Sequence, residues 1–135
     1  MKNIFVYGTL MYAEVWRRVA HKDYPWKRAR LHNYQRYRVK NALYPGLVKS
    51  RNGLVEGVAY FGVEHGDIQR LDRFEGDYYQ RLPVIIEADE IGRCRAEVYI
   101  FRNRYRRCLS GRVWRTEEFG AKAREKFLAG YRGFY

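Results

Sequence analysis

The sequence predicts a single α+β domain with a largely antiparallel, curled sheet and three helices. About six short apolar or alternating segments are separated by turn residues, which is typical of strands joined by tight turns. Three other segments repeat their apolar residues at helical spacing. The chain has 135 residues, 47% of them hydrophobic and 31% charged. Residues 1–135 are therefore expected to form one domain around one core.

The N-terminal segment predicts a strand followed by a helix. Ile4–Tyr7 is a short, continuous apolar run that ends at Gly8, and such a run indicates a strand buried on both faces. Residues 12–21 place Val15 and Val19 four positions apart, which is the spacing of one helix face.

The next segments predict strands. Residues 28–40 alternate loosely and suit a partly exposed strand. Residues 43–48 read as a turn that leads into a second strand. The dipeptide Asn52-Gly53 is a strong hairpin signal, so we expect the return strand to run over residues 54–61.

A second helix is expected over residues 64–74. Ile68, Leu71 and Phe74 fall at helical spacing there, and Gly76 is suited to cap the C-terminal end of the helix.

The remaining segments predict a strand pair and a third helix. Residues 79–87 and 93–101 alternate as strands joined by a turn at 89–92. The last helix is expected to begin near Thr116, which is a good N-cap residue. Its apolar stripe repeats every four residues and consists of Phe119, Ala123, Phe127 and Tyr131.

The chain is strongly basic and rich in aromatic residues. Its net charge is +12, and 17% of its residues are aromatic. Basic charge with interleaved tyrosines can indicate nucleic-acid binding, because Arg and Lys neutralise phosphates while rings stack on bases. A basic nucleic-acid-binding domain therefore remains an alternative. The basic residues are scattered rather than gathered in one block, which argues against a specific nucleic-acid partner. An anionic small-molecule substrate would also be attracted by this charge.

The residue types that hold metals and cofactors lack the usual spacings. Cys94 and Cys108 belong to no CxxC pattern, and we expect both to be reduced thiols. The three histidines form no HxxH or HExxH pattern, and no glycine-rich loop fits a dinucleotide or a phosphate. We therefore expect no metal and no cofactor.

No segment is suited to a membrane or to secretion. The first apolar run is broken at Gly8-Thr9, and no stretch approaches the roughly 18 apolar residues that span a bilayer. We expect a cytoplasmic protein that does not contact a membrane. The sequence does not indicate its oligomeric state.

Glu75 is a carboxylate in an unusual place. Helical spacing from Ile68 and Leu71 brings Glu75 to the same apolar face, just before the helix ends. Burial there would raise its pKa, and the negative end of the helix dipole would add a smaller effect in the same direction. By spacing alone, a helix-terminal glutamate exposed to water is the simpler interpretation.

The turn Tyr7-Gly8-Thr9-Leu10 is the second candidate feature. A strand that ends in Gly-Thr and continues into a helix can point several backbone N–H groups into one concavity, which suits an anion such as a carboxylate. An ordinary strand-to-helix turn would have the same sequence.

Four short motifs, in this order, resemble the γ-glutamyl cyclotransferase-like superfamily. The similarity extends from residue 3 to about residue 101 and is greatest to the branch that holds γ-glutamylamine cyclotransferases and the plant avirulence-induced proteins. The motifs are Phe5-Val6-Tyr7-Gly8-Thr9-Leu10, Tyr44-Pro45-Gly46-Leu47, Val55-Glu56-Gly57, and Leu71-Asp72-x-Phe74-Glu75-Gly76-x-x-Tyr79-x-Arg81.

The resemblance implies a small mixed β-barrel flanked by helices, with a cavity beside the Tyr7–Leu10 loop. It implies that Glu75 is the catalytic glutamate and that the backbone of Gly8, Thr9 and Leu10 grips a glutamyl head group. Tyr7, Gly46 and Tyr79 match positions expected near the substrate. Arg81 matches a family position as well, but a structural role would explain it. The Gly-Thr-Leu form of the first motif differs from the Gly-Ser-Asn-Leu of the glutathione-degrading type, which argues against a glutathione-related substrate.

The implied reaction is an intramolecular cyclisation. The α-amine of a γ-glutamyl group attacks its own γ-carbonyl, which forms 5-oxoproline and releases an amine, with Glu75 as general acid and base. No cofactor is required. Two alternatives remain open, namely the same fold with other small-molecule chemistry or ligand binding only, and the basic nucleic-acid-binding domain.

Overall fold

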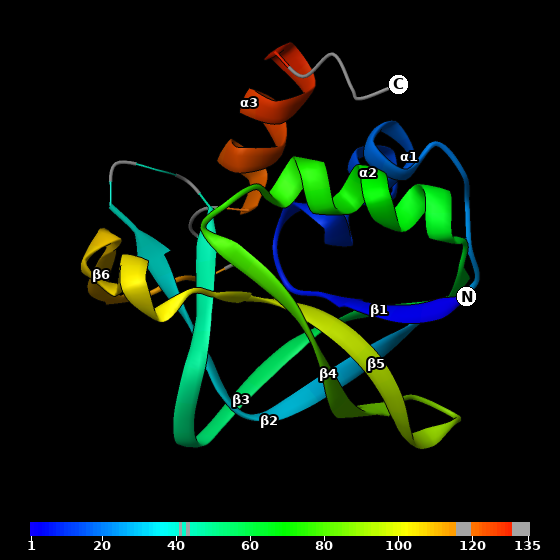
Figure 1. Cartoon of the computed structure of the whole chain (residues 1–135), viewed down its shortest axis with the longest axis horizontal. Coiled ribbons are helices and arrows are strands. Elements are labelled where there is room, and N and C mark those ends of the chain that lie inside the picture. The colour runs from blue at the N-terminus through cyan, green and yellow to red at the C-terminus, as the bar shows by residue number, and fades with distance from the viewer. Residues whose placement is uncertain (41, 43, 116–119, 131–135) are drawn as a thin grey trace.

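In the computed structural model, five strands pair into a closed ring (Figure 1). The structure describes residues 1–40, 42, 44–115 and 120–130. In chain order, the elements are β1 (Lys2–Val6), the short 3-10 turn η1 (Thr9–Met11), α1 (Ala13–Ala20), β2 (Trp26–Val39), β3 (Pro45–Val63), α2 (His65–Glu75), β4 (Tyr79–Ala88), β5 (Gly92–Phe101), the 3-10 helix η2 (Asn103–Cys108), β6 (Leu109–Val113) and α3 (Ala121–Gly130).

The ring follows the order β3-β1-β5-β4-β2 and closes where β2 pairs with β3. The β1–β5 pair is parallel and the other pairs are antiparallel, so the sheet is mixed and largely antiparallel as expected. The short strand β6 pairs with the C-terminal part of β2. The short strand β1 therefore has a neighbouring strand on each side, β3 and β5.

β1 separates two hydrophobic cores. Ile4 and Val6 belong to the core under the helices, whereas Phe5 and Tyr7 belong to the core inside the ring of strands. Ile4 and Phe5 are completely buried. A continuous apolar run is needed when both faces of a strand are covered, and this confirms the expectation for Ile4–Tyr7.

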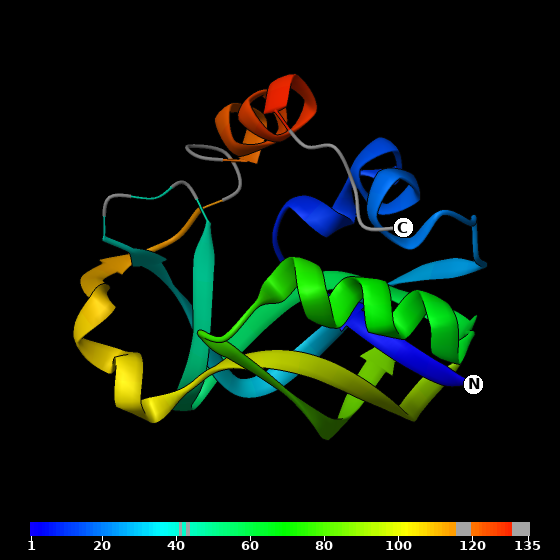
Figure 2. The ribbon, with the colours of Figure 1, turned by 45° about the horizontal axis from the view of Figure 1, so that its top comes forward.

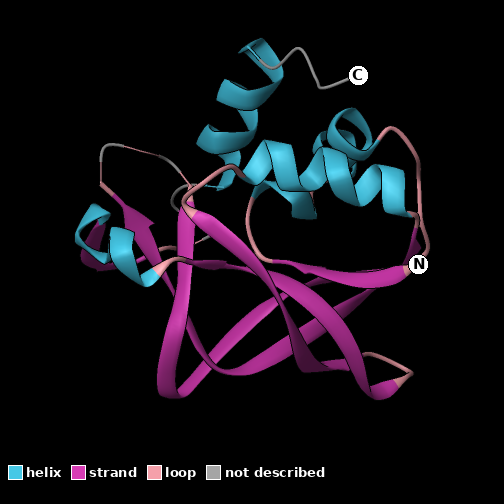
Figure 3. Ribbon diagram, in the orientation of Figure 1, coloured by secondary structure: helices cyan, strands magenta, loops and turns pink. Residues whose placement is uncertain are grey.

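The three α-helices lie on one side of the strands (Figure 3). α1 and α2 pack above β1, and α3 lies beside them (Figure 2). In α1, Val15 and Val19 are fully buried, and in α2 the same holds for Leu71. In the described part of the chain, no helix has both the length and the apolar character that crossing a membrane requires.

The hairpin predicted at Asn52-Gly53 is wrong. β3 continues through this dipeptide, and the chain reverses instead in the connection between β2 and β3. His32 pairs with Leu54 and Tyr34 pairs with Lys49, so residues 50–53 bulge opposite a single residue of β2. Asn52 has φ 63°, and the left-handed conformation that favours Asn-Gly in a hairpin is used here in a bulge.

The third helix was predicted with its apolar stripe, and Phe127 of this stripe is buried in α3. The expected cap Thr116 and the stripe residues Phe119 and Tyr131 lie outside the described residues. The sequence patterns gave no indication of β6 or η2, which together contain four Arg residues and only four apolar ones.

Candidate active site

A cavity of about 360 Å³ lies between the end of β1, the C-terminal end of α2 and the beginning of β3. It brings together Glu75, Tyr79 and the entire Tyr7–Leu10 loop, which the sequence analysis had proposed as site residues. The other lining residues are mostly aromatic or aliphatic: Phe5, Val6, Val39, Ala42, Tyr44, Pro45, Phe74, Tyr78, Tyr99 and Phe101.

Glu75 is the last residue of α2 and faces this cavity. Ile68 and Leu71, on the same face of the helix, are buried in the core below the helices. Gly76 has φ 76° and donates its N–H to the carbonyl of Asp72 at 3.1 Å, which ends the helix as predicted. The chain turns away here, and the Glu75 carboxyl is left at the edge of the core.

Of the described residues that line the cavity, Glu75 is the only acidic one. It is half-buried, and it forms no hydrogen bond or ion pair with any other residue that the structure describes. Burial raises its pKa from the ordinary 4.5 to about 8, and the negative charge of nearby Asp72 contributes in the same direction. A carboxyl in this state can exchange a proton near neutral pH.

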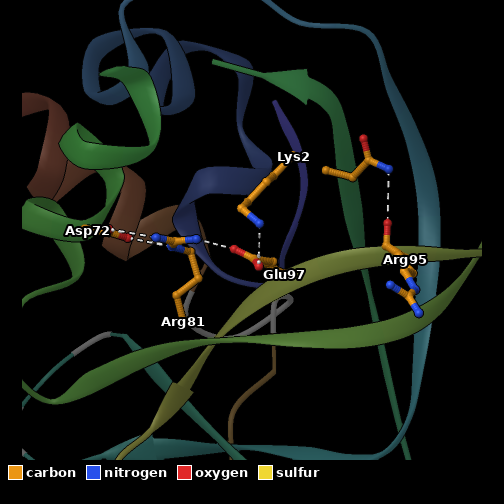
Figure 4. A network of polar contacts seen from close by, with 6 residues as sticks. Lys2, Asp72, Arg81, Arg95 and Glu97 are labelled. Atoms are coloured by element: carbon orange, nitrogen blue, oxygen red, sulfur yellow. Dashed lines mark hydrogen bonds and ion pairs between the residues drawn. The ribbon is translucent and has the colours of Figure 1, made fainter. Parts of the chain in front are cut away.

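Asp72 is held by a network that extends away from the cavity (Figure 4). Arg81 donates to both carboxylate oxygens of Asp72, from Nε at 3.0 Å and from Nη2 at 3.3 Å, and its Nη1 bonds Glu97. The opposite oxygen of Glu97 forms an ion pair with Lys2 at 3.2 Å. Tyr99 donates its hydroxyl to Asp72 at 2.6 Å.

This network ties α2 to β4, β5 and β1. Arg81 does not line the cavity, which agrees with a structural role for it. Its influence on the site passes through Asp72, the residue whose charge acts on Glu75.

The Tyr7–Leu10 loop is fixed by its carbonyl groups. The carbonyls of Gly8 and Thr9 accept hydrogen bonds from the N–H groups of Met11 and Tyr12, both at 3.0 Å, and so form the turn η1. Arg36 donates to the carbonyl of Tyr7 at 2.9 Å. The first N–H groups of such a turn have no partner within it. They remain suited to bind an anion in the cavity.

Gly8 lies close to the start of β3. A Cβ atom on Gly8 would lie 3.3 Å from two ring carbons of Pro45, which is a tight contact. The small residue therefore lets the loop approach the opposite wall of the cavity. Thr9 and Leu10 are buried at 4% and 3% exposure.

Three tyrosine hydroxyls around Glu75 are already used as donors. Tyr7 donates to the carbonyl of Tyr99, Tyr79 donates to the carbonyl of Pro45 at 2.7 Å, and Tyr99 donates to Asp72. Burial raises the pKa of each of these tyrosines, and the charge of Glu75 raises it further. All three are neutral near pH 7, so Glu75 alone supplies a titrating group.

Gly46 is not in the cavity lining. A Cβ atom there would lie 2.7 Å from Cδ2 of Leu109 and 2.8 Å from Cδ1 of Phe101. Gly46 therefore lets Phe101, which does line the cavity, pack closely against β3. Gly46 thus supports the cavity wall from behind and does not face the cavity itself.

Sequence reasoning missed several lining residues. Tyr99 lies on the face of β5 opposite Ala96 and Val98, and this alternation could have separated it from the residues inside the ring. Tyr44 occurs in the second of the four motifs, but nothing in its spacing indicates that it lines the cavity. Its pKa is raised by burial.

Among the described residues that line the cavity, none is Lys, Arg or His. An anionic group bound here would therefore be held by backbone N–H and hydroxyl groups, and a cationic group would be held by Glu75. Among the residues that the structure describes, no three His, Cys, Asp or Glu side chains gather as metal ligands.

Comparisons with known proteins agree with this architecture. Residues 4–116 match the sequence model of the family described as gamma-glutamyl cyclotransferase, AIG2-like. Protein AIG2 C of Arabidopsis thaliana is 30% identical over 131 residues, which cover 96% of this chain and 79% of that protein.

Solved structures show the same fold. The solution structure of At3g28950.1 from Arabidopsis thaliana has a TM-score of 0.74 and 30% identity, and the match covers 95% of this chain and 78% of that one. A structure of a gamma-glutamyl cyclotransferase has a TM-score of 0.65 at 16% identity, with 99% and 90% covered. The match of the family model to most of the sequence shows that this protein belongs to the gamma-glutamyl cyclotransferase, AIG2-like family.

Proposed function

We propose that this protein cyclises the γ-glutamyl group of a γ-glutamyl amide or amine conjugate, which yields 5-oxoproline and a free amine. Glu75 is the general acid and base, and the Tyr7–Leu10 loop binds the glutamyl head group. The family assignment supports this class of reaction. The observation that carries the proposal is the position of Glu75, a carboxyl with a raised pKa that shares one cavity with the loop.

The substrate is bound at its two charged groups. Its α-ammonium lies beside Glu75, the only acid among the described lining residues. Its α-carboxylate accepts hydrogen bonds from the N–H groups of Gly8, Thr9 and Leu10, since none of the described lining residues is cationic. These two contacts fix the α-carbon, and contact of the leaving half with the cavity wall folds the γ-carbonyl back toward the α-amine. Such positioning can supply about 7–11 kcal/mol of the barrier reduction, more than the roughly 3–5 kcal/mol typical of acid–base assistance.

The proton path needs only Glu75. The carboxylate takes a proton from the α-ammonium, and the neutral amine nitrogen then attacks the γ-carbonyl carbon. A new C–N bond closes the five-membered ring, and the bond from this carbon to the leaving nitrogen breaks. The carboxyl gives its proton to the leaving nitrogen, takes the second proton from the ring nitrogen and passes it to the released amine, which leaves as an ammonium ion. The enzyme thus ends in its starting state.

The leaving half of the substrate faces apolar surface. Phe74, Tyr78 and Phe101 line the cavity together with Val39. Such a wall excludes water and strengthens the interaction between the ammonium and Glu75. It also favours an amine with a hydrocarbon or aromatic part.

The test is the formation of 5-oxoproline from a panel of γ-glutamyl amines by the parent protein and by Glu75→Gln. The amide keeps the size of the side chain but cannot take a proton, so we expect turnover to fall by at least about a hundredfold. Glu56→Gln is the matched control, because Glu56 is an exposed glutamate on β3. It should retain the parent rate.

Two results would contradict the proposal. Equal rates for Glu75→Gln and Glu56→Gln would exclude Glu75 as the base. Binding of γ-glutamyl amines without any 5-oxoproline would favour the alternative of a ligand-binding protein with the same fold.

A further inference from the structure

The positive charge of the protein comes from two segments that lie side by side. Residues 31–55 contain five Lys and Arg residues, residues 98–115 contain six, and neither segment contains an Asp or Glu. This leaves 16 of the 27 basic residues to balance all 15 acidic ones. β6, in the second segment, pairs with the end of β2, in the first. The excess charge is therefore gathered at one end of the ring of strands.

Many of these cations lack a counter-charge. Elsewhere, some basic residues are paired, as in Arg17–Asp23, Lys22–Glu64 and Lys27–Glu90. Others, such as Arg28 and Arg73, form no ion pair with a described residue, but they lie in segments that also contain acidic residues. At the basic end, six residues form no ion pair with any residue that the structure describes: Lys49, Arg51, Arg102, Arg106, Arg107 and Arg112. We call these six side chains the basic face. Uncompensated charge of this kind favours an anionic partner.

A groove of about 410 Å³ lies within the basic face. The exposed residues Lys49 and Arg106 and the half-buried Arg102 line it. Arg102 donates from Nη1 to Oε1 of Gln80 at 3.2 Å, while its buried Nε has no hydrogen-bond partner among the described residues. None of the groove-lining residues in the described part of the chain is acidic.

The inner wall of the groove is apolar. It is formed by Val48, Leu82, Ile100 and Phe101, with the ring of Tyr34 beside them. A ligand that fits both parts needs a flat or apolar portion against this wall and an anionic portion beside the cationic residues. A simple phosphate or sulfate could interact only with the cationic residues. A nucleotide could interact with both parts, since its base can stack on a ring while its phosphate contacts Arg and Lys.

We propose that the basic face binds a single-stranded nucleic acid, with one base in the groove beside Tyr34 and successive phosphates along the cations of β3, η2 and β6. A strand is favoured over a mononucleotide because Arg51, Arg107 and Arg112 belong to the basic face but not to the groove lining. Because RNA and DNA strands share this chemistry, both are used as probes.

This surface is distinct from the cavity that holds Glu75. Of the residues that line the groove, only Phe101 also lines that cavity. Nucleic-acid binding at the basic face can therefore be tested independently of cyclisation in the Glu75 cavity.

The test is fluorescence anisotropy of labelled rU12 and dT12 with the full chain, from 50 to 200 mM salt. We expect a linear fall of log affinity with log salt, as each neutralised phosphate releases counterions. The variant Lys49→Gln/Arg106→Gln/Arg107→Gln should bind at least roughly tenfold more weakly at 50 mM salt and should lower the magnitude of the slope by about 2. Tyr34→Leu should weaken strand binding roughly tenfold and leave binding of polyphosphate unchanged.

A charge-matched control separates this face from net charge. Arg17→Gln/Lys22→Gln/Lys27→Gln removes the same charge from paired positions and should change the affinity by less than roughly threefold. Thermal unfolding checks that each variant is folded. Equal losses for both triple variants would overturn the proposal. So would equal affinity for the 12-mers and for polyphosphate of the same charge, or for the 12-mers and uridine monophosphate.

Discussion

The Glu75 carboxyl lies where two effects disfavour its charged form. Burial at the cavity is the larger one, and the charge of Asp72 adds to it. The C-terminal end of α2 also carries partial negative charge, worth about 0.3–1 kcal/mol. A residue with these properties weakens the fold when it ionises, so its presence at this position is better explained by chemistry than by stability.

Glu75→Gln should therefore stabilise the protein at high pH. The native pKa of about 8 exceeds the ordinary 4.5, so the stability that Glu75 contributes is present below pH 4.5 and is lost as pH rises through 8. Gln stays neutral throughout. At about 1.4 kcal/mol per pKa unit, the variant should be more stable by up to about 5 kcal/mol at pH 9, less where water enters the cavity.

Urea unfolding at pH 5 and pH 9 measures this difference. The two proteins should have nearly equal free energies of unfolding at pH 5, and the variant should be clearly more stable at pH 9. A difference that is the same at both pH values would show that Glu75 titrates normally.

The sequence predicted that Glu75 lies on the apolar face of its helix, but it did not predict that the carboxyl is buried. Helical spacing from Ile68 and Leu71 is a local property, and it placed the carboxyl on the core side of α2. The walls that enclose it include Tyr44 and Pro45 at the start of β3 and Tyr99 and Phe101 of β5. These residues are distant in sequence, so only the tertiary fold reveals that they meet.

At the scale of elements, the link between α2 and the two strands β4 and β5 sets the electrostatics of the site. Arg81 neutralises Asp72 through two hydrogen bonds. Asp72 in turn acts on Glu75. This is a positioning role, since Arg81 does not line the cavity.

Arg81→Met should move the pH profile of kcat/KM to higher pH. In the parent protein, kcat/KM should rise with pH through about 8, because the free enzyme must hold Glu75 as a carboxylate. Without Arg81, the charge of Asp72 is less neutralised and raises the pKa of Glu75 further. The measurement is kcat/KM for 5-oxoproline formation across pH 6 to 10.

Arg73→Met provides the control for this profile, because Arg73 is an exposed cation on the same helix. It should leave the midpoint of kcat/KM near its parent value. A lower rate for Arg81→Met with an unchanged midpoint would contradict the role given to Asp72.

Local patterns predicted most elements, and they failed where a turn signal served another purpose. Asn52-Gly53 has the φ preference of a hairpin turn, yet β3 uses it in a bulge opposite β2. A Cβ atom on Gly53 would lie 2.3 Å from the carbonyl oxygen of Tyr34, so the neighbouring strand also requires glycine here. The dipeptide Asn52-Gly53 indicates a residue in the left-handed conformation. Whether the chain reverses at that residue is decided by how β2 and β3 pair.

At the scale of the whole molecule, β1 links the two cores and leads directly into the loop of the site. The ring closes through the pairing of β2 with β3, which no local pattern could predict. α3, from the far end of the sequence, reaches the same region: Phe127 contacts Phe74 edge to face, with ring centroids 5.7 Å apart. Phe74 lines the cavity next to Glu75.

Phe127→Ala should affect both stability and substrate binding. Phe127 is 4% exposed, and removal of a buried Phe side chain costs about 3–5 kcal/mol when the surroundings cannot relax. Since α3 contacts the rest of the fold less than α1 and α2 do, we expect a smaller loss of about 2–3 kcal/mol. Loss of support for Phe74 should raise KM more than it lowers kcat. Steady-state kinetics and urea unfolding measure the two effects, and an unchanged KM would show that α3 does not influence the cavity.

The most direct test is a titration of the Glu75 side-chain carboxyl by carbon-13 NMR, with Glu75→Gln to assign its signal. A carboxyl shielded in the cavity beside Asp72 predicts a midpoint near pH 8 in the protein without ligand. A midpoint near 4.5 would mean that the group is hydrated as in a simple peptide, and would contradict its role as the base.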